Sequence, residues 1–280
     1  MIPARFDYDV AESVDHAIEL LAAGGGDTKL LAGGQSLIPA LRLRISRPAK
    51  LADLGRLADL AYVKDGGTHV AIGAMTRHAA VATDALLAEH CPIVAYAAGQ
   101  IGDPPVRHRG TIGGTLSHGD PASDLPAVVL ALGADLVARG KGGERVIPAA
   151  DFFTGVFETA LAPDEVLVEV RVPKLAASTG WSYLKANRRA QDWATVAVAA
   201  LVHRDDGKVA GASIGLVNMG PTPLRARAAE DALAGGASLA DAATAVTEGA
   251  DPPSDLAGSS EYRAHLAQVL TRRALEQAAG

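Results

Sequence analysis

The chain has 280 residues, which is enough for two domains, and 49% of them are hydrophobic, so it can bury sizeable cores. Its formal net charge of -6 argues against a nucleic-acid-binding protein, which needs a basic surface. Its single cysteine, Cys91, excludes an internal disulfide framework and cannot hold an iron–sulfur cluster by itself.

The first 54 residues predict a small β-α-β unit. Ser13 is a suitable N-cap for a helix that runs to about Ala23, because apolar residues recur after it at helical spacing. Short strands are predicted at 29–32 and 50–53. Gly33-Gly34-Gln35-Ser36 follows the first strand and leads into a helix near Ser36, which leaves free N–H groups where a phosphate binds well.

The middle of the chain predicts hairpins, short helices and one long strand. Asp65-Gly66-Gly67 gives the turn of the first hairpin, and Thr76 is the expected cap of the helix after it. The hairpins are predicted at 61–73 and 134–147, the helices at 77–81, 84–89, 91–99 and 124–132, and the strand at 165–172.

A linker is predicted around residues 173–180, where the pattern changes. The remainder predicts a sheet followed by helices. The strands are expected at 181–185, 194–203 and 208–217, and the helices at 225–233, 239–247 and 261–278. The last helix carries one apolar stripe and is expected to pack on the core.

Two glycine-rich stretches are the strongest functional signal. One is RGTIGGTLSHGDPASD at 109–124, and the other is LLAGGQSL at 30–37. Glycine allows close backbone approach to a ligand, and successive N–H groups can surround one anion. Each stretch alone is also compatible with a tight surface turn. On two separate strand-to-helix turns they would supply opposed rows of N–H donors. About four to six such bonds, at ~1.5–3 kcal/mol each, would hold a pyrophosphate without lysine or arginine.

Other motifs are weaker. No G-x-G-x-x-G or Walker A sequence follows a strand, which argues against those nucleotide sites. The one G-x-S-x-G, at 211–215, places Ser213 inside a predicted strand, whereas an esterase needs a strand-to-helix turn. The histidines form no zinc-binding pair. With no signal peptide and no run of ~18 uncharged apolar residues, we expect a cytoplasmic location.

A basic cluster lies at 42–50 and contains Arg42, Arg44, Arg47 and Lys50. Such a run is compatible with a solvated face. It is also compatible with a docking surface for an acidic partner, or with an edge that faces a phosphate.

Three longer segments resemble a known family. AGGQS, RGTIGGT followed by HGDPASDLPAVVLAL, and KANRRAQDWATVAVA are similar to the FAD-binding subunit of molybdenum hydroxylases. This family includes the medium subunit of aerobic carbon monoxide dehydrogenase and the flavin domain of xanthine dehydrogenase. The resemblance extends over the whole chain, to the terminal EYRAHLAQVLTRRALE.

The resemblance implies an α+β fold in two domains. Residues 1–175 would form a two-lobed FAD-binding domain of the PCMH type, with lobes at about 1–54 and 55–175. Residues 176–280 would form a smaller domain of three-stranded antiparallel sheet plus helices, like the C-terminal domain of the CO dehydrogenase flavoprotein.

It also implies a cofactor site. Residues 30–37 and 111–115 would wrap the FAD pyrophosphate, and Asp124 would hold a hydroxyl of FAD. Thr115 stands where asparagine is common in the family, so its side-chain contact is expected to differ. The implied cofactor-binding residues are Leu30, Leu31, Ala32, Gly33, Gly34, Gln35, Ser36, Leu37, Ile101, Thr111, Ile112, Gly113, Gly114, Thr115, Asp124, Leu167 and Lys185. No catalytic residue and no metal ligand is implied.

The function implied is that of the flavin subunit in a three-component molybdenum hydroxylase. A large subunit would carry the molybdenum cofactor, and a small subunit would carry two [2Fe-2S] clusters. FAD would pass electrons to an external acceptor, in a dimer of heterotrimers. A self-contained FAD oxidoreductase and a non-catalytic nucleotide-binding scaffold remain as alternatives, and the substrate of the complex stays open.

Overall fold

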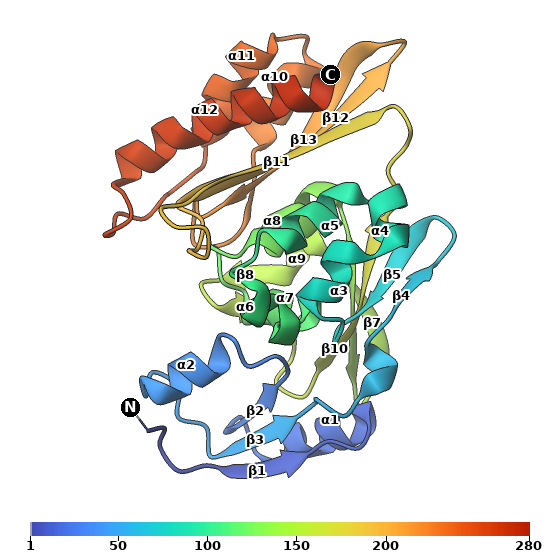
Figure 1. The fold of residues 1–280 in the computed structure, drawn as a ribbon, viewed down its shortest axis with the longest axis vertical. Helices are drawn as coiled ribbons and strands as arrows, with labels where there is room; N and C mark the ends of the chain where they lie inside the picture. The colour runs from blue at the N-terminus through green and yellow to red at the C-terminus, as the bar shows by residue number, and fades with distance from the viewer. Residues whose placement is uncertain (1) are drawn as a thin grey trace.

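The computed structural model describes residues 2–280, so Met1, with which the predicted first lobe begins, lies outside the described residues. The chain forms three parts that follow one another along the long axis of the molecule (Figure 1). A small N-terminal lobe lies at one end, a larger second lobe in the middle, and a C-terminal domain at the other end.

The first lobe is a three-stranded parallel sheet with a helix on it. The sheet has the order β1-β3-β2, and the predicted helix begins where expected, because Ser13 accepts a hydrogen bond from the N–H of His16. The strand β1 was not predicted, since its residues are polar and mostly exposed. The elements are β1 (Asp7–Val10), α1 (Val14–Ala23), β2 (Thr28–Leu31), α2 (Leu37–Arg42) and β3 (Lys50–Asp53).

The second lobe is a five-stranded antiparallel sheet covered by short helices. The strand order is β4-β5-β10-β6-β7, with both predicted hairpins at its edges and the predicted long strand in its centre. The sheet strands are β4 (Val63–Asp65), β5 (His69–Gly73), β6 (Asp135–Gly140), β7 (Gly143–Pro148) and β10 (Val166–Pro173). The other elements are η1 (Ala58–Leu60), α3 (His78–Thr83), α4 (Ala85–His90), α5 (Pro92–Gly99), α6 (Pro104–Arg109), α7 (Ile112–His118), α8 (Asp124–Leu132), α9 (Ala149–Phe152), β8 (Phe153–Gly155) and β9 (Glu158–Thr159).

The central strand β10 serves two cores because it contains a bulge. The register against β6 shifts between Leu167 and Glu169. An extra residue in one strand reverses the alternation of side chains beyond it. Val166 and Val168 therefore pack in the core of the first lobe, whereas Val170 and Val172, which would share their face in a regular strand, pack in the core of the second lobe. This strand attaches the first lobe to the rest of the molecule.

The C-terminal domain is an antiparallel sheet with helices on its outer face (Figure 1). Its three long strands are those that the resemblance implied, and a two-residue strand, β14, extends the sheet. The elements are β11 (Thr179–Ala186), β12 (Val196–Asp205), β13 (Lys208–Val217), β14 (Leu224–Arg225), α10 (Arg227–Ala234), α11 (Leu239–Thr244), η2 (Ala245–Thr247) and α12 (Ser260–Ala279). The α+β fold is thereby confirmed.

The strand β12 is buried on both faces. Val196, Val198 and Ala200 pack toward α10 and α12, while Ala197 and Ala199 pack toward the second lobe. Small residues on the inner face allow the sheet to approach α8 closely. The C-terminal domain therefore shares a core with the second lobe.

Two local predictions in the second lobe were wrong. The segment 101–118, for which no helix was predicted, contains the helices α6 and α7, because the side chains of Asp103 and Thr111 cap their first turns. Thr76 does not cap α3. Arg77 occupies the N-cap position, and the Thr76 hydroxyl instead bonds to the backbone of Tyr62.

The G-x-S-x-G sequence has a packing role. Ser213 lies within β13, as expected from the sequence, so no strand-to-helix turn exposes it. A Cβ on Gly215 would lie 2.1 Å from the carbonyl oxygen of Ala127 in α8. Gly215 therefore lets the sheet pack directly on that helix.

We predict that Gly215→Val lowers the free energy of unfolding by about 1–3 kcal/mol, the usual range for an overpacked site. The carbonyl of Ala127 belongs to a buried helix and has little room to move. Urea denaturation measures the effect. Gly211→Val is the matched control, because a Cβ there meets nothing within 4 Å. Equal stability of the two variants would contradict the packing role.

Candidate functional site

The first glycine turn presents a row of unpaired backbone donors. Gly34 has a φ of 73°, which turns the chain from β2 into α2. Within the described residues, the N–H groups of Gly33, Gly34, Gln35 and Ser36 have no hydrogen-bond acceptor in the protein. These four donors can therefore bind an anion, as the sequence predicted.

The second glycine motif differs from the prediction. Thr111–Thr115 forms the cap and first turn of α7 instead of a strand-to-helix turn. Its amides already have partners: the N–H of Ile112 bonds to Thr76, that of Gly113 to Ala74, and those of Gly114 and Thr115 to Thr111. The expected second row of free donors is thus absent from this motif, which supplies a wall and hydroxyl groups.

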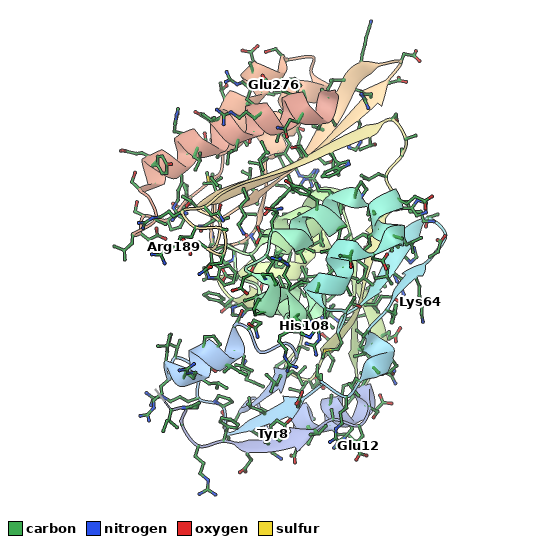
Figure 2. The ribbon with its side chains drawn as sticks, viewed as in Figure 1. Tyr8, Glu12, Lys64, His108, Arg189 and Glu276 are labelled. Atoms are coloured by element: carbon green, nitrogen blue, oxygen red, sulfur yellow. The ribbon has the colours of Figure 1, made fainter. Side chains whose placement is uncertain are left out.

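The two motifs lie against each other. A Cβ on Gly33 would stand 2.4 Å from the carbonyl oxygen of Arg109, and one on Gly114 would stand 3.6 Å from the Cβ of Ala32. The same atom on Gly114 would be 2.7 Å from the Thr111 hydroxyl that caps the helix. A side chain at Gly33 would push the motifs apart, whereas a Cβ at Gly114 would displace the Thr111 cap and lie in ordinary contact with Ala32. The crevice between the lobes is the hollow that Gly33 lines from the first lobe and Arg77 and Arg109 line from the second, and His108 of α6 lies on the side of the second lobe that faces the first (Figure 2).

Behind the second motif lies a buried histidine. Nε2 of His78 is 2.9 Å from the hydroxyl of Thr115, and its Nδ1 has no partner. Burial, together with the guanidinium groups of Arg107 and Arg77, lowers the pKa of His78 to about 4. Because an orphaned buried N–H is more costly than an orphaned acceptor, we assign the proton to Nε2. The Thr115 hydroxyl then accepts from His78 and keeps its own proton to donate.

A buried ion pair joins the second lobe to the C-terminal domain. The carboxylate of Asp124, at the start of α8, lies 3.0 Å from Nζ of Lys185, and the two side chains are only 4% and 5% exposed. The Tyr183 hydroxyl donates to the same carboxylate at 2.5 Å, and Lys185 also donates to the carbonyl of Gln100 at 3.1 Å. The fold thus brings Asp124 and Lys185 together beside Ile101, which follows Gln100 in the chain.

Burial sets the protonation behaviour of this group. It raises the pKa of Asp124, although the Lys185 ammonium and the Tyr183 hydroxyl act in the opposite direction. Burial and the nearby Asp124 carboxylate raise the pKa of Tyr183 well above its usual value. Tyr183 is therefore a permanent donor to Asp124. The sequence motif YLKANRR contains this tyrosine, but its position on the inner face of β11 was the only signal for its role.

The other predicted residues are distributed along the lobe contact. Leu30 lines an open hollow of about 370 Å³ with Ser117, whereas Leu31, Ala32 and Gly33 line a second hollow of about 260 Å³. The side chains of Ile112 and Leu167 are buried in the core. A ligand can therefore reach those two residues only through their backbone.

Arginines near the first turn were not predicted. Arg56, Arg77 and Arg109 line the smaller hollow beside Gly33, and Arg77 donates to the carbonyl of Arg109. Burial and the Arg109 guanidinium lower the pKa of Arg77. We expected a phosphate to be held without lysine or arginine, yet positive charge lies next to the turn. The three residues come from separate segments, so only the fold reveals their proximity.

These features fit a bound dinucleotide. The four free N–H groups suit a pyrophosphate, and the close glycine contacts form a cradle that side chains would fill. In the part of the chain that the structure describes, no three histidine, cysteine or acidic residues cluster as metal ligands. Fold and site define an FAD-binding flavoprotein, in two lobes with an appended sheet-and-helix domain.

Comparison with known proteins identifies the family. The family model for the FAD binding domain in molybdopterin dehydrogenase matches residues 4–175, and that for the CO dehydrogenase flavoprotein C-terminal domain matches residues 181–278. The chain therefore belongs to the FAD-binding medium subunits of the molybdenum hydroxylases, and it is a flavoprotein oxidoreductase subunit with FAD as its cofactor.

Individual relatives match over nearly their full length. The chain is 41% identical to the carbon monoxide dehydrogenase medium chain of Hydrogenophaga pseudoflava, over 99% of this chain and 98% of that protein. It is also 41% identical to the 6-hydroxypseudooxynicotine dehydrogenase complex subunit alpha of Paenarthrobacter nicotinovorans, over 99% and 96%. A solved structure of the Hydrogenophaga pseudoflava carbon monoxide dehydrogenase, lacking the Mo-pyranopterin moiety of its cofactor, matches with a TM-score of 0.95 and 42% identity, over 99% of this chain and 98% of that chain.

The buried His78 predicts an acid-sensitive stability. Its folded-state pKa of about 4 lies below the ordinary 6.5, so the unfolded chain binds the proton first as the pH falls. The contribution of His78 to the free energy of unfolding is therefore fully present above pH 6.5. As the pH falls to about 4, the free energy of unfolding decreases by roughly 3 kcal/mol. Urea denaturation of the wild type and of His78→Gln, at several pH values, measures it. The difference between the two proteins should change over this interval, and a constant difference would contradict the prediction.

Proposed function

We propose that this chain takes electrons from [2Fe-2S] clusters in a small partner subunit and passes them to an external acceptor. A large subunit with the molybdenum cofactor would oxidise the substrate. We further propose a dimer of heterotrimers, a cytoplasmic location and a division into domains at 1–175 and 176–280. The extents of the two matching family models, 4–175 and 181–278, support that division.

One observation supports the assignment to electron transfer. The crevice is equipped to hold a dinucleotide, but the chain has one cysteine, and burial raises the pKa of its thiol to about 11. A [2Fe-2S] cluster needs four ligands, usually cysteine thiolates. The clusters that reduce the flavin must therefore belong to another chain. FAD, when bound, supplies the redox chemistry, and this chain supplies binding and orientation.

Each part of the crevice has a proposed task. The free N–H groups of residues 33–36 bind the pyrophosphate, and Thr115 donates its hydroxyl proton to it. Asp124 accepts a hydroxyl of FAD while Lys185 and Tyr183 fix the carboxylate. Ile101 borders the flavin, and the backbone of Leu167 lies along the remainder of the cofactor. The burial of Asp124 and Lys185 excludes water from the surroundings of the carboxylate. This burial supports the proposal that Asp124 accepts a hydroxyl of FAD.

The substrate stays open. The two relatives described above are equally similar to this chain, yet their names specify different substrates, carbon monoxide and 6-hydroxypseudooxynicotine. The substrate is therefore a property of the large subunit in this proposal.

We predict that Gly114→Val expels FAD. The new side chain would collide with the Thr111 hydroxyl that caps α7. Its methyl groups would enter the space beside Ala32, where the two motifs meet. Losing about two charge-assisted hydrogen bonds corresponds to binding weaker by a factor of roughly 10² to 10⁴. The ratio of flavin to protein after gel filtration measures it, and denaturation should release the flavin from the wild type. Gly142→Val is the control, since a Cβ there meets nothing within 4 Å. Full retention of FAD by Gly114→Val would limit this glycine to a structural role.

The isolated chain tests the whole proposal. Purified with FAD, it should be reduced by dithionite but leave carbon monoxide, purines, N-heterocycles and aromatic thioesters unchanged. Adding the molybdenum and iron–sulfur subunits should restore bleaching of the flavin by the substrate of the complex. Turnover by the chain alone would establish a self-contained oxidoreductase instead. A colourless protein that binds no added FAD would indicate a scaffold without flavin.

A further inference from the structure

His78 is a buried histidine whose ring lies against the second glycine motif. It begins α3, it is 2% exposed, and its backbone N–H donates to the carbonyl of Gly110 at 2.9 Å. A Cβ on Gly110 would lie 2.7 Å from Cδ2 of the ring, so glycine at that position leaves the ring the room that it occupies. Backbone bonding and packing therefore hold the imidazole in one place.

The ring makes a single side-chain hydrogen bond. Nε2 lies 2.9 Å from the hydroxyl of Thr115, whereas Nδ1 is buried and has no partner within the described residues. A buried polar atom without a partner costs free energy, and leucine would fill a similar space without that cost. Stability therefore does not account for a histidine here, and only the contact with Thr115 needs a nitrogen at this position.

Thr115 is the side-chain donor of the segment 112–115. The backbone N–H groups of these four residues are all bonded within the protein, and the other three residues are Ile112 and two glycines. Thr115 is half-buried, and its neighbour Gly114 lies beside Ala32 of the first lobe. The residue is thus bonded to His78 on its inner side, while its outer side remains open to a ligand.

The tautomer of His78 decides which way the Thr115 proton points. A hydroxyl has one proton, so it can donate to only one of two neighbours. If Nε2 were an acceptor, Thr115 would donate inward and turn its lone pairs toward a bound phosphate, which repels them. If Nε2 carries the proton, the hydroxyl accepts from it and keeps its own proton for the phosphate. The unpaired Nδ1 selects the second arrangement, because a buried N–H without an acceptor is the costlier orphan.

We propose that His78 is a positioning residue for FAD, which donates from Nε2 to the Thr115 hydroxyl and so directs the proton of that hydroxyl at the FAD pyrophosphate. This inference rests on the proposed function, in which Thr115 donates to the pyrophosphate. His78 lies behind Thr115 and acts on the cofactor only through it. A hydrogen bond to a charged acceptor is stronger than one between neutral groups, so the direction of this proton has a measurable effect on the affinity for FAD.

The test measures the dissociation constant of FAD for the full chain, from which FAD is first removed, and the free energy of unfolding from urea denaturation. His78→Leu removes the donor and keeps a side chain of similar size. His78→Gln keeps an N–H donor at about the reach of Nε2. Thr115→Val removes the hydroxyl and keeps the shape of the side chain. The double variant His78→Leu/Thr115→Val shows whether the two residues act as a unit.

Val81→Ala is the matched control. Val81 lies one turn after His78 on the same helix and is fully buried. Truncating it leaves a cavity, which lowers the free energy of unfolding without touching the hydrogen bond to Thr115. The affinity of this variant for FAD should therefore equal that of the wild type.

We expect His78→Leu and Thr115→Val each to bind FAD more weakly by a factor of roughly 10 to 100, which corresponds to one hydrogen bond to a charged acceptor. His78→Gln should bind nearly as tightly as the wild type, and the double variant no more weakly than Thr115→Val alone. His78→Leu should at the same time keep or raise the free energy of unfolding. Phosphorus NMR of bound FAD should show the pyrophosphate resonances displaced in His78→Leu and Thr115→Val but not in Val81→Ala.

Three results would overturn the inference. The first is wild-type affinity for FAD in His78→Leu. The second is a double variant in which the losses of the two single variants add, because the residues would then act independently. The third is an affinity that falls in step with stability across all variants, Val81→Ala included, as a merely structural histidine would give.

Failure of the proposed function is seen separately. If Thr115→Val binds FAD as tightly as the wild type, the task proposed for Thr115 fails, and the inference about His78 fails with it. If the chain alone oxidises a substrate of the complex, the proposed electron transfer fails. The FAD affinities of the variants would still decide the inference in that case.

Discussion

The close approach of Gly33 to the backbone at Arg109 is the contact on which the crevice depends. Because neither partner places a side chain between them, the turn after β2 and the end of α6 converge on the same point. The consequence is a division of roles. The first turn keeps its N–H groups free, whereas the second has used its own to fold. The two motifs, similar in sequence, therefore differ in physical function.

A second constraint ties the C-terminal domain to the crevice. Asp124 begins α8 in the second lobe, and its partners Lys185 and Tyr183 belong to β11. Removing two charges from water costs about as much as their attraction returns, so such a pair contributes little to stability. The effect of the ion pair is to fix the positions of these side chains relative to one another. Through Gln100, the pair also positions the chain at Ile101, so one ion pair aligns three segments of the site.

Local signals made much of the fold predictable. The helix from Ser13 and the helix from Asp124 have caps and apolar periodicity within their own residues, and the hairpins have glycine turns. The helix α6 could have been found, because Asp103 followed by Pro104 is a cap with proline in the first turn. The strand β1 could not, since pairing with β3 stabilises a polar sequence.

The site was predictable only where its residues were sequential. The residue pattern alone indicated both glycine motifs, and the resemblance added Asp124 and Lys185. It gave no indication that the amides of residues 112–115 are bonded within the fold. Arg56, Arg77 and His78 escaped notice for another reason. Their neighbours in space are distant in sequence, and neither a helix nor a strand pattern encodes such proximity.

The bulge in β10 has a consequence for the order of folding. The first lobe is synthesised first, but the valines that cover its apolar face, Val166 and Val168, emerge only after most of the second lobe. Until then Ile18 and Leu21 of α1 have no complete core. Contacts between such distant segments slow folding and leave apolar surface exposed to other chains. The nascent N-terminal lobe therefore keeps apolar surface uncovered until the central strand is complete.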